Sequence, residues 1–238
     1  YNPLSLSYTN NGTATCLTTG VVDPTLENDP PNICGGVSTY MWTFTDQCQN
    51  TITEDQRITV LPMPSPMFVN PPGNITAACE NMPLSAADLQ VINNGPAGCN
   101  INTTVSPVLE GTPTACGGSY NFKWTYDGQC QDIEHIQTVT ITPPPQGTFQ
   151  NPPANITVNC DNTPQLSDFP ALTITNNLTG VCAVNASVSP NVTGLPQNYC
   201  GGVITATWTH TDQCQNTVTN TQTVTVNPAP QAIFSNVP

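Results

Sequence analysis

The residues best suited to chemistry in this sequence are cysteines that recur in three nearly identical stretches beginning with Cys-Gly-Gly. Each stretch also holds a tryptophan, an aspartate and a second cysteine. Cysteine, histidine and aspartate are common zinc ligands, and nearby cysteines can form a redox centre. The stretches are CGGVSTYMWTFTDQCQN (34–50), CGGSYNFKWTYDGQCQD (116–132) and CGGVITATWTHTDQCQN (200–216). Each stretch is therefore either a chemical site, for metal binding or redox chemistry, or a structural motif.

The cysteine spacing favours disulfides over metal. The chain has 11 cysteines but no C-x-x-C pair, and only His135 and His210 could complete a zinc site. Structural zinc sites need closely spaced ligand pairs, whereas consecutive cysteines within a repeat here are 14 to 22 residues apart. We therefore predict disulfides, no metal and no cofactor, in a protein of an oxidising compartment.

The charge balance excludes several classes of partner. The 238 residues include 15 acidic and 2 basic side chains, for a net charge of −13. Nucleic acids and anionic membranes need clustered Lys and Arg, so neither is expected as a partner. No apolar run approaches the roughly 20 residues of a membrane helix, so we expect no direct membrane insertion. Calcium is conceivable, although the carboxylates are scattered and no D-x-D-x-D-G loop occurs.

An internal repeat of about 82 residues organises the chain. The Cys-Gly-Gly landmark recurs at steps of 82 and 84, and NPPGNITAAC (70–79) returns as NPPANITVNC (151–160). The second and third repeats hold four cysteines each and the first holds three, so we expect the fourth to precede residue 1, in a longer tandem array. The predicted domains are 1–66 (partial, without its N-terminal strand), 67–147 and 148–232 (complete) and 233–238 (the start of a further repeat).

Alternation along the tryptophan stretches predicts strands. Ser38, Tyr40, Trp42 and Phe44 share one parity, and mostly polar residues occupy the other. The same alternation surrounds Trp124 and Trp208, so all three tryptophans are expected in a core rather than on a sugar-binding surface. Thr- and Val-rich runs follow each turn. We predict an all-β fold of tandem immunoglobulin-like β-sandwich repeats, stapled by disulfides.

Sandwich topology suggests a disulfide pairing within each repeat. The first strand and the start of the tryptophan strand should lie at one end, and the two remaining cysteines at the other. Pairing the two ends of one tryptophan strand is disfavoured, because they lie about 25 Å apart. The predicted pairs are Cys16–Cys48, Cys79–Cys116, Cys99–Cys130, Cys160–Cys200 and Cys182–Cys214, with Cys34 bonded to a residue outside the chain.

Proline-rich linkers join the repeats, at 61–72, 143–153 and 227–238. Proline fixes φ and lacks a donor, so these linkers should be extended and semi-rigid. Phe68, Phe149 and Phe234 occupy equivalent places in them. Each phenylalanine packs either on the junction between repeats or in the core of its own repeat, and the sequence favours neither.

The motif W-T-x-T-D-x-C-x-N-T, followed by a T-x-T-V-T-V strand and P-A-P, resembles the hyalin-repeat (HYR) family of immunoglobulin-like domains. WTFTDQCQNT (42–51) and WTHTDQCQNT (208–217) match closely, while WTYDGQCQD (124–132) has a shifted aspartate. The Cys-Gly-Gly motif and four cysteines per repeat resemble a subgroup in giant surface adhesins of Bacteroidetes, of the SprB-like gliding-motility type. The resemblance covers essentially the whole chain. It implies an extracellular adhesion or stalk role and export by type IX secretion.

Site chemistry beyond disulfides is weakly indicated. Asp46 and Asp212 precede cysteines in turns, where capping is the ordinary role and calcium binding the alternative. No catalytic motif occurs, and no paired carboxylates recur between repeats, so we do not expect an enzyme.

These observations favour a structural or adhesive stalk segment of a secreted or cell-surface adhesin or filament. Its partners would be neighbouring repeats, surface glycans or other cell-surface proteins. A carbohydrate- or calcium-binding array and a non-catalytic appendage of a secreted enzyme remain alternatives.

Overall fold

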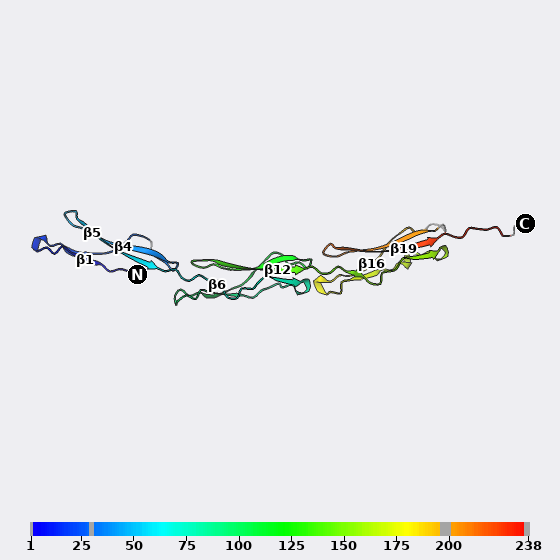
Figure 1. Cartoon of the computed structure of the whole chain (residues 1–238), viewed down its shortest axis with the longest axis horizontal. Coiled ribbons are helices and arrows are strands. Elements are labelled where there is room, and N and C mark those ends of the chain that lie inside the picture. The colour runs from blue at the N-terminus through cyan, green and yellow to red at the C-terminus, as the bar shows by residue number, and fades with distance from the viewer. Residues whose placement is uncertain (1, 29–30, 196–200, 236–238) are drawn as a thin grey trace. The chain divides into compact units, whose positions relative to one another are not determined.

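The computed structural model describes residues 2–28, 31–195 and 201–235, and it is all-β (Figure 1). No α-helix occurs in these ranges, and none of their helical turns is long and apolar enough to cross a membrane. Four of the 3-10 turns begin or end at a cysteine. The turns are η1 (Ala14–Cys16), η2 (Cys79–Asn81), η3 (Cys160–Asn162), η4 (Leu166–Asp168) and η5 (Gly180–Cys182).

Three long two-stranded segments carry the tryptophan stretches. In each, the tryptophan strand is followed by a turn and by the Thr- and Val-rich strand that pairs with it. They are β4 (Gly36–Thr45) with β5 (Thr51–Val60), β11 (Gly118–Tyr126) with β12 (Ile133–Thr142), and β18 (Gly202–Thr211) with β19 (Thr217–Asn227). The alternation of large apolar and polar residues thus produces strands with one buried face.

The third sequence copy forms a sandwich of two sheets. One sheet has the order β14-β19-β18-β17 and the other β13-β15-β16. Phe169 and Leu172 from one side pack with Trp208, Ile204 and Val224 from the other, closing one hydrophobic core. The additional strands are β13 (Thr148–Phe149), β14 (Ile156–Asn159), β15 (Leu172–Thr175), β16 (Asn185–Val188) and β17 (Asn191–Thr193).

The second copy has sheets of the same composition, β10-β11-β12-β7 and β6-β8-β9. In both copies the Asn-Ile-Thr segment adds a parallel strand to the outer edge of the sheet, β7 on β12 and β14 on β19. The additional strands are β6 (Met67–Phe68), β7 (Ile75–Ala78), β8 (Leu89–Ile92), β9 (Asn102–Val105) and β10 (Val108–Glu110).

The first copy is less complete among the described residues. Its sheets are β1-β2 and β3-β4-β5, formed with β1 (Leu6–Thr9), β2 (Thr19–Val22) and β3 (Thr25–Leu26). Among the described strands β5 lies at the edge of its sheet and pairs with β4 alone, whereas β12 and β19 each lie between two strands. Val60 is accordingly 36% exposed, while Val226, at the same register position, is 3% exposed.

Compactness divides the chain into two units. One contains residues 1–72, 87–108 and 123–136, and the other contains 73–86, 109–122 and 137–238. Both units contain residues of the second copy, so the boundaries of the units do not coincide with those of the 82-residue repeats. Strands β6 and β13 begin at residues 67 and 148, immediately after the predicted repeat boundaries, and those domain boundaries stay a prediction.

Candidate functional site: the cysteine junctions

The three tryptophans lie in the core. Trp42 is 5% exposed, and Trp124 and Trp208 are fully buried. Each indole Nε1 donates a hydrogen bond to a backbone carbonyl 37 or 38 residues earlier, which leaves no unpaired donor inside. The acceptors are the carbonyl oxygens of Leu4 at 3.1 Å, Ala87 at 3.0 Å and Pro170 at 3.0 Å. These rings are therefore structural and offer no face for stacking on a sugar.

The disulfides join one sequence copy to the next, which corrects the predicted pairing within copies. Cys34 of the first copy bonds to Cys130 of the second, with Cα atoms 5.2 Å apart. The second copy is bonded twice to the third, through Cys79–Cys182 (Cα–Cα 6.1 Å) and Cys116–Cys214 (5.2 Å). We call the region of Cys34, Cys99 and Cys130 the first junction. The region of Cys79, Cys116, Cys182 and Cys214 is the second junction.

Most of the predicted pairs are wrong. Cys79–Cys116, Cys99–Cys130 and Cys182–Cys214 do not form, because Cys79, Cys116, Cys130, Cys182 and Cys214 have partners in other copies. Cys34 bonds within the chain rather than to a residue outside it. Cys16–Cys48 does not form either, since both are free thiols, as are Cys99 and Cys160. Cys200, the predicted partner of Cys160, lies outside the described residues.

The physical reason is that these cysteines lie where one copy contacts the next. The predicted pairs assume contacts within a single copy, with the Cys-Gly-Gly cysteine at one end of the tryptophan strand and the next cysteine beyond the other end. The structure brings the first of these beside the turn that follows the next tryptophan strand along the chain. Contact between successive copies therefore decides the pairing.

The glycines after Cys34, Cys116 and Cys200 hold the chain in a conformation that other residues resist. Gly35 has φ +92° and Gly117 has φ +95°. A Cβ on Gly35 would lie 3.0 Å from the Pro62 nitrogen, and one on Gly117 would lie 3.1 Å from Pro143 Cδ. The motif thus packs a cysteine loop tightly against the start of the following proline linker.

Aspartate side chains position two of the turn cysteines. Asp46 Oδ1 accepts hydrogen bonds from the backbone N–H groups of Cys48 and Asn50, both at 2.8 Å. Asp212 Oδ1 accepts the same bonds from Cys214 at 2.8 Å and Asn216 at 2.9 Å. In the second copy the two positions are exchanged in role: Asp132 stands at the position of Asn50, and its Oδ1 accepts from the N–H of Gly128, which stands at the position of Asp46, at 3.0 Å.

These hydrogen bonds favour the ionised carboxylates. Those from the side chain and backbone of Asn50 hold the pKa of Asp46 below its usual range. Partial burial opposes ionisation of Asp212, but hydrogen bonds from Asn216 and Cys214 outweigh it and lower the pKa. Both aspartates thus cap turns. Within the described ranges no three His, Cys, Asp or Glu side chains gather as metal ligands, so the calcium alternative gains no ligand set.

In each copy an asparagine braces the loop that leads to the cysteine six residues later, which is Cys16, Cys99 or Cys182. Asn93 is 2% exposed, and its Oδ1 accepts from Gly95 and Ile101 while its Nδ2 donates to the carbonyls of Cys99 (2.7 Å) and Pro64 (3.2 Å). Asn176 bonds Cys182 and Pro145 in the same way.

Asn10 donates to the Cys16 carbonyl at 2.8 Å. Our sequence reasoning missed these asparagines, although the spacing Asn-x5-Cys recurs in all three copies and could have revealed them. We call Asn10, Asn93 and Asn176 the asparagine braces.

The linker phenylalanines belong to their own sheets where the structure decides the question. Phe68 lies in β6 and its ring is 6.2 Å from that of His135. Phe149 lies in β13 and packs against the core around Trp208. Phe234 is 93% exposed. Packing within one copy is thus the better of the two alternatives for Phe68 and Phe149.

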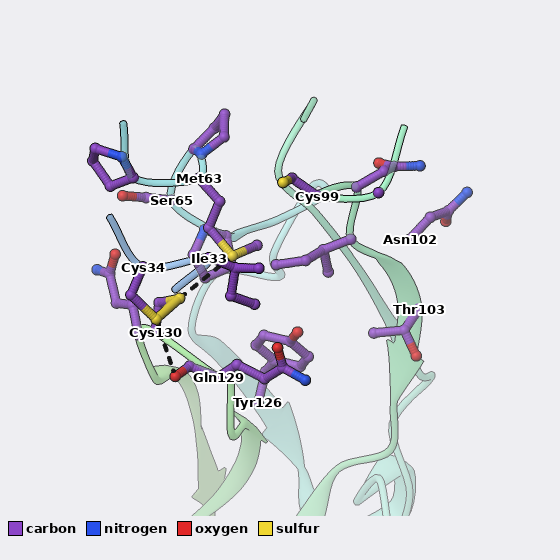
Figure 2. Close-up of a pocket in the computed structure, with 18 residues that line it drawn as sticks. Ile33, Cys34, Met63, Ser65, Cys99, Asn102, Thr103, Tyr126, Gln129 and Cys130 are labelled. Atoms are coloured by element: carbon purple, nitrogen blue, oxygen red, sulfur yellow. Dashed lines mark hydrogen bonds between the residues drawn. A yellow bond between two sulfur atoms is a disulfide. The ribbon is translucent and has the colours of Figure 1, made fainter. Parts of the chain in front are cut away.

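A pocket of about 670 Å³ opens at the first junction (Figure 2). The Cys34–Cys130 disulfide and Met63 lie on one side of it and the Cys99 loop on the other. Met63 Sδ is 3.5 Å from Cys130 Sγ. The wall is mixed in character, with Ile33, Tyr126 and prolines beside backbone amides, and Cys99 provides a free thiol.

Comparisons with known proteins assign no family. No family model and no curated protein matches this chain. Among solved structures, a weak likeness exists to the M60 catalytic domain with the CBM51-1 and CBM51-2 domains of Clostridium perfringens ZmpB. Its TM-score is 0.25 at 7% identity, and the alignment covers 94% of this chain and 31% of that one. This chain thus spans less than a third of that neighbour.

Proposed function

We propose that this chain is a structural, load-bearing segment of a multi-repeat adhesin or filament outside the cell. The observation that carries the proposal is that every described disulfide joins consecutive sequence copies. A protein that only needs stable domains staples each one internally. Bonds between copies instead provide a covalent route for tension that bypasses the copies themselves.

The route is short. Tension entering at Cys34 passes to Cys130, runs back 14 residues to Cys116, and crosses to Cys214. The shortest covalent path along the whole chain then includes roughly 70 of its 238 residues. The remaining residues belong to stretches of chain that the disulfides bypass, so they carry no tension while the bonds are intact.

Composition and resemblance support the same proposal. The net charge of −13 keeps such segments soluble and resists their self-association. Three disulfides indicate an oxidising environment outside the cytosol. The HYR-like motifs add bacterial cell-surface placement, adhesion and an association with gliding motility to the proposal.

Single-molecule stretching tests it. At about 3.5 Å per residue, the fully extended oxidised chain should reach roughly 250 Å and the reduced chain roughly 830 Å. A variant with Cys34, Cys116, Cys130 and Cys214 replaced by serine should extend as the reduced chain does, apart from the loop closed by Cys79–Cys182. Equal extension of the oxidised and reduced chains would remove the proposal.

A further inference from the structure

The outer edge of β5 exposes residues whose counterparts are buried elsewhere. β4 pairs Gly36 with Val60 as β18 pairs Gly202 with Val226, so Ile58 and Val60 correspond to Val224 and Val226. Val224 is 1% and Val226 3% exposed, whereas Val60 is 36% exposed and Ile58 is half-buried. An open edge with apolar residues is a template for another strand.

The other copies show which strand covers this edge. β7 pairs in parallel with β12, matching Ile75 with Val139, and β14 pairs with β19, matching Ile156 with Val224. An asparagine just before each added strand fixes the register. Asn74 Oδ1 accepts from Thr138 N–H, and Asn155 Oδ1 accepts from Thr223 N–H, both at 2.8 Å.

A glutamine on the receiving strand adds a second anchor. Gln137 Nε2 donates to the Gly73 carbonyl at 2.8 Å, and Gln222 Nε2 donates to the Ala154 carbonyl at 2.9 Å. Gln56 occupies the same register position on β5. β5 therefore carries both the apolar pair and the glutamine of a receiving strand.

The cysteine that ends β7 has a defined partner, whereas Cys160, which ends β14, is a free thiol. Cys79 directly follows β7 and bonds to Cys182, and the two are 4% and 1% exposed. Cys99 corresponds to Cys182, because Asn93 and Asn176 brace the two loops alike. Cys99, however, is a half-buried free thiol beside the pocket of the first junction. The linker residues that follow β5, Pro62 to Pro66, line this same pocket.

We propose that the β5 edge and the Cys99 pocket form one docking site for a strand of the type Asn-Ile-Thr-x-x-Cys, carried by a further repeat of this kind. The strand pairs in parallel with β5 and covers Ile58 and Val60. Its cysteine enters the pocket and bonds to Cys99, so that the first junction acquires two disulfides like the second.

The bond formation balances as an ordinary thiol oxidation. Two thiols lose two protons and two electrons in forming the disulfide. The electrons pass by thiol–disulfide exchange to a small disulfide oxidant such as oxidised glutathione, which is reduced to two thiols. The inference does not depend on the proposed mechanical function.

A fusion tests the site in the full chain. Trp42 bonds the Leu4 carbonyl as Trp124 bonds that of Ala87, so residue 84 corresponds to residue 1. A duplicate of residues 70–83, NPPGNITAACENMP, placed directly before Tyr1 is therefore in register. After oxidation with glutathione, peptide mapping should find the added cysteine bonded to Cys99. Backbone amides of residues 57–60 should exchange hydrogen at least tenfold more slowly than in the unfused chain.

Two control fusions separate the strand from the cysteine. A fusion with the duplicate of Cys79 replaced by serine should keep the slow exchange but leave Cys99 free. One with the duplicates of Asn74 and Ile75 replaced by alanine and aspartate should lose the slow exchange.

Unchanged exchange at residues 57–60 in the first fusion would overturn the proposal. So would an added cysteine that bonds to any residue other than Cys99, or Cys99 exchanging into the Cys34–Cys130 bond. None of these results depends on the stretching experiment, so either proposal can fail without the other.

Discussion

The two junctions use the same parts but differ in completeness. Both contain a Cys-Gly-Gly loop bonded to the turn after the next tryptophan strand, at the same Cα separation of 5.2 Å. The second junction adds Cys79–Cys182, and both of those cysteines are buried. The first junction has a pocket and the free thiol of Cys99 at the corresponding place.

This difference shows how the parts depend on one another. At the second junction, where β7 is present, the edge of the sheet is covered, the apolar residues Val139 and Ile141 are buried and the second disulfide forms. Where no such strand lies among the described residues, all three features are absent together. The strand thus accompanies a covered sheet edge in the second and third copies, whereas the cysteine after it is bonded in the second copy (Cys79) and is a free thiol in the third (Cys160).

Removal of disulfides should produce the largest difference in stability and local opening between the two junctions. Replacing Cys79 and Cys182 together by serine should cost roughly 4–5 kcal/mol of unfolding free energy, because the bond closes a loop of 103 residues. In the Cys79→Ser, Cys182→Ser variant the second junction still has the Cys116–Cys214 bond. The Cys34→Ser, Cys130→Ser variant removes the one disulfide described at the first junction, so that junction should open completely. Denaturant unfolding measures the free energy and hydrogen exchange near Met63 and Pro143 measures local opening. Equal local opening at both junctions would contradict this ranking.

Matched valine truncations should sharpen the contrast between the sheet edges. Val226→Ala removes fully buried methyl groups and should lower the unfolding free energy by about 2 kcal/mol. Val60→Ala, at the equivalent position on the open edge, should cost less than about 1 kcal/mol. Urea unfolding of the two variants, with the parent chain as control, provides the comparison. A larger loss for Val60→Ala would break it.

The asparagine braces should rank by burial. Asn93→Ala leaves the carbonyl of Cys99 and the amides of Gly95 and Ile101, all of half-buried residues, without their bonds to this buried side chain, so we expect a loss of about 1–3 kcal/mol. Asn10→Ala removes similar bonds at an exposed site and should cost less than about 1 kcal/mol. Thermal unfolding checks both. Asn93→Asp is the matched variant, because it keeps the acceptor but places a second carboxylate oxygen against the carbonyls of Cys99 and Pro64, so it should cost at least as much as Asn93→Ala.

The turn aspartates should produce the smallest effect, seen at low pH. Their pKa values are lowered in the folded chain, so their stabilising contribution is full above the unfolded pKa. It is lost as the pH falls below about 4 and through the folded pKa. Asp46→Asn and Asp212→Asn should each flatten the acid limb of a stability–pH profile. An unchanged acid limb in the double variant would show that the ionised aspartates do not stabilise the folded chain.

Much of the local structure was predictable because it depends on short-range patterns. Alternation around Trp42, Trp124 and Trp208 predicted the long strands and their buried faces. The Asp-Gln-Cys turns predicted the capping role of Asp46 and Asp212. The asparagine braces also depend on a local pattern, and their Asn-x5-Cys spacing was sufficient to predict them.

By itself, the sequence determined the all-β class, the 82-residue period, the four cysteines of each complete repeat and the inward tryptophans. Each follows from residue type and spacing along a strand or turn. Only the tertiary structure decided that Cys34 bonds to Cys130, and that Val60 stays exposed while Val226 is buried. The disulfide depends on which loops of neighbouring copies meet, and the burial of Val226 depends on a strand of its own copy, β14, that pairs with β19; both kinds of contact join residues about 70 to 100 positions apart.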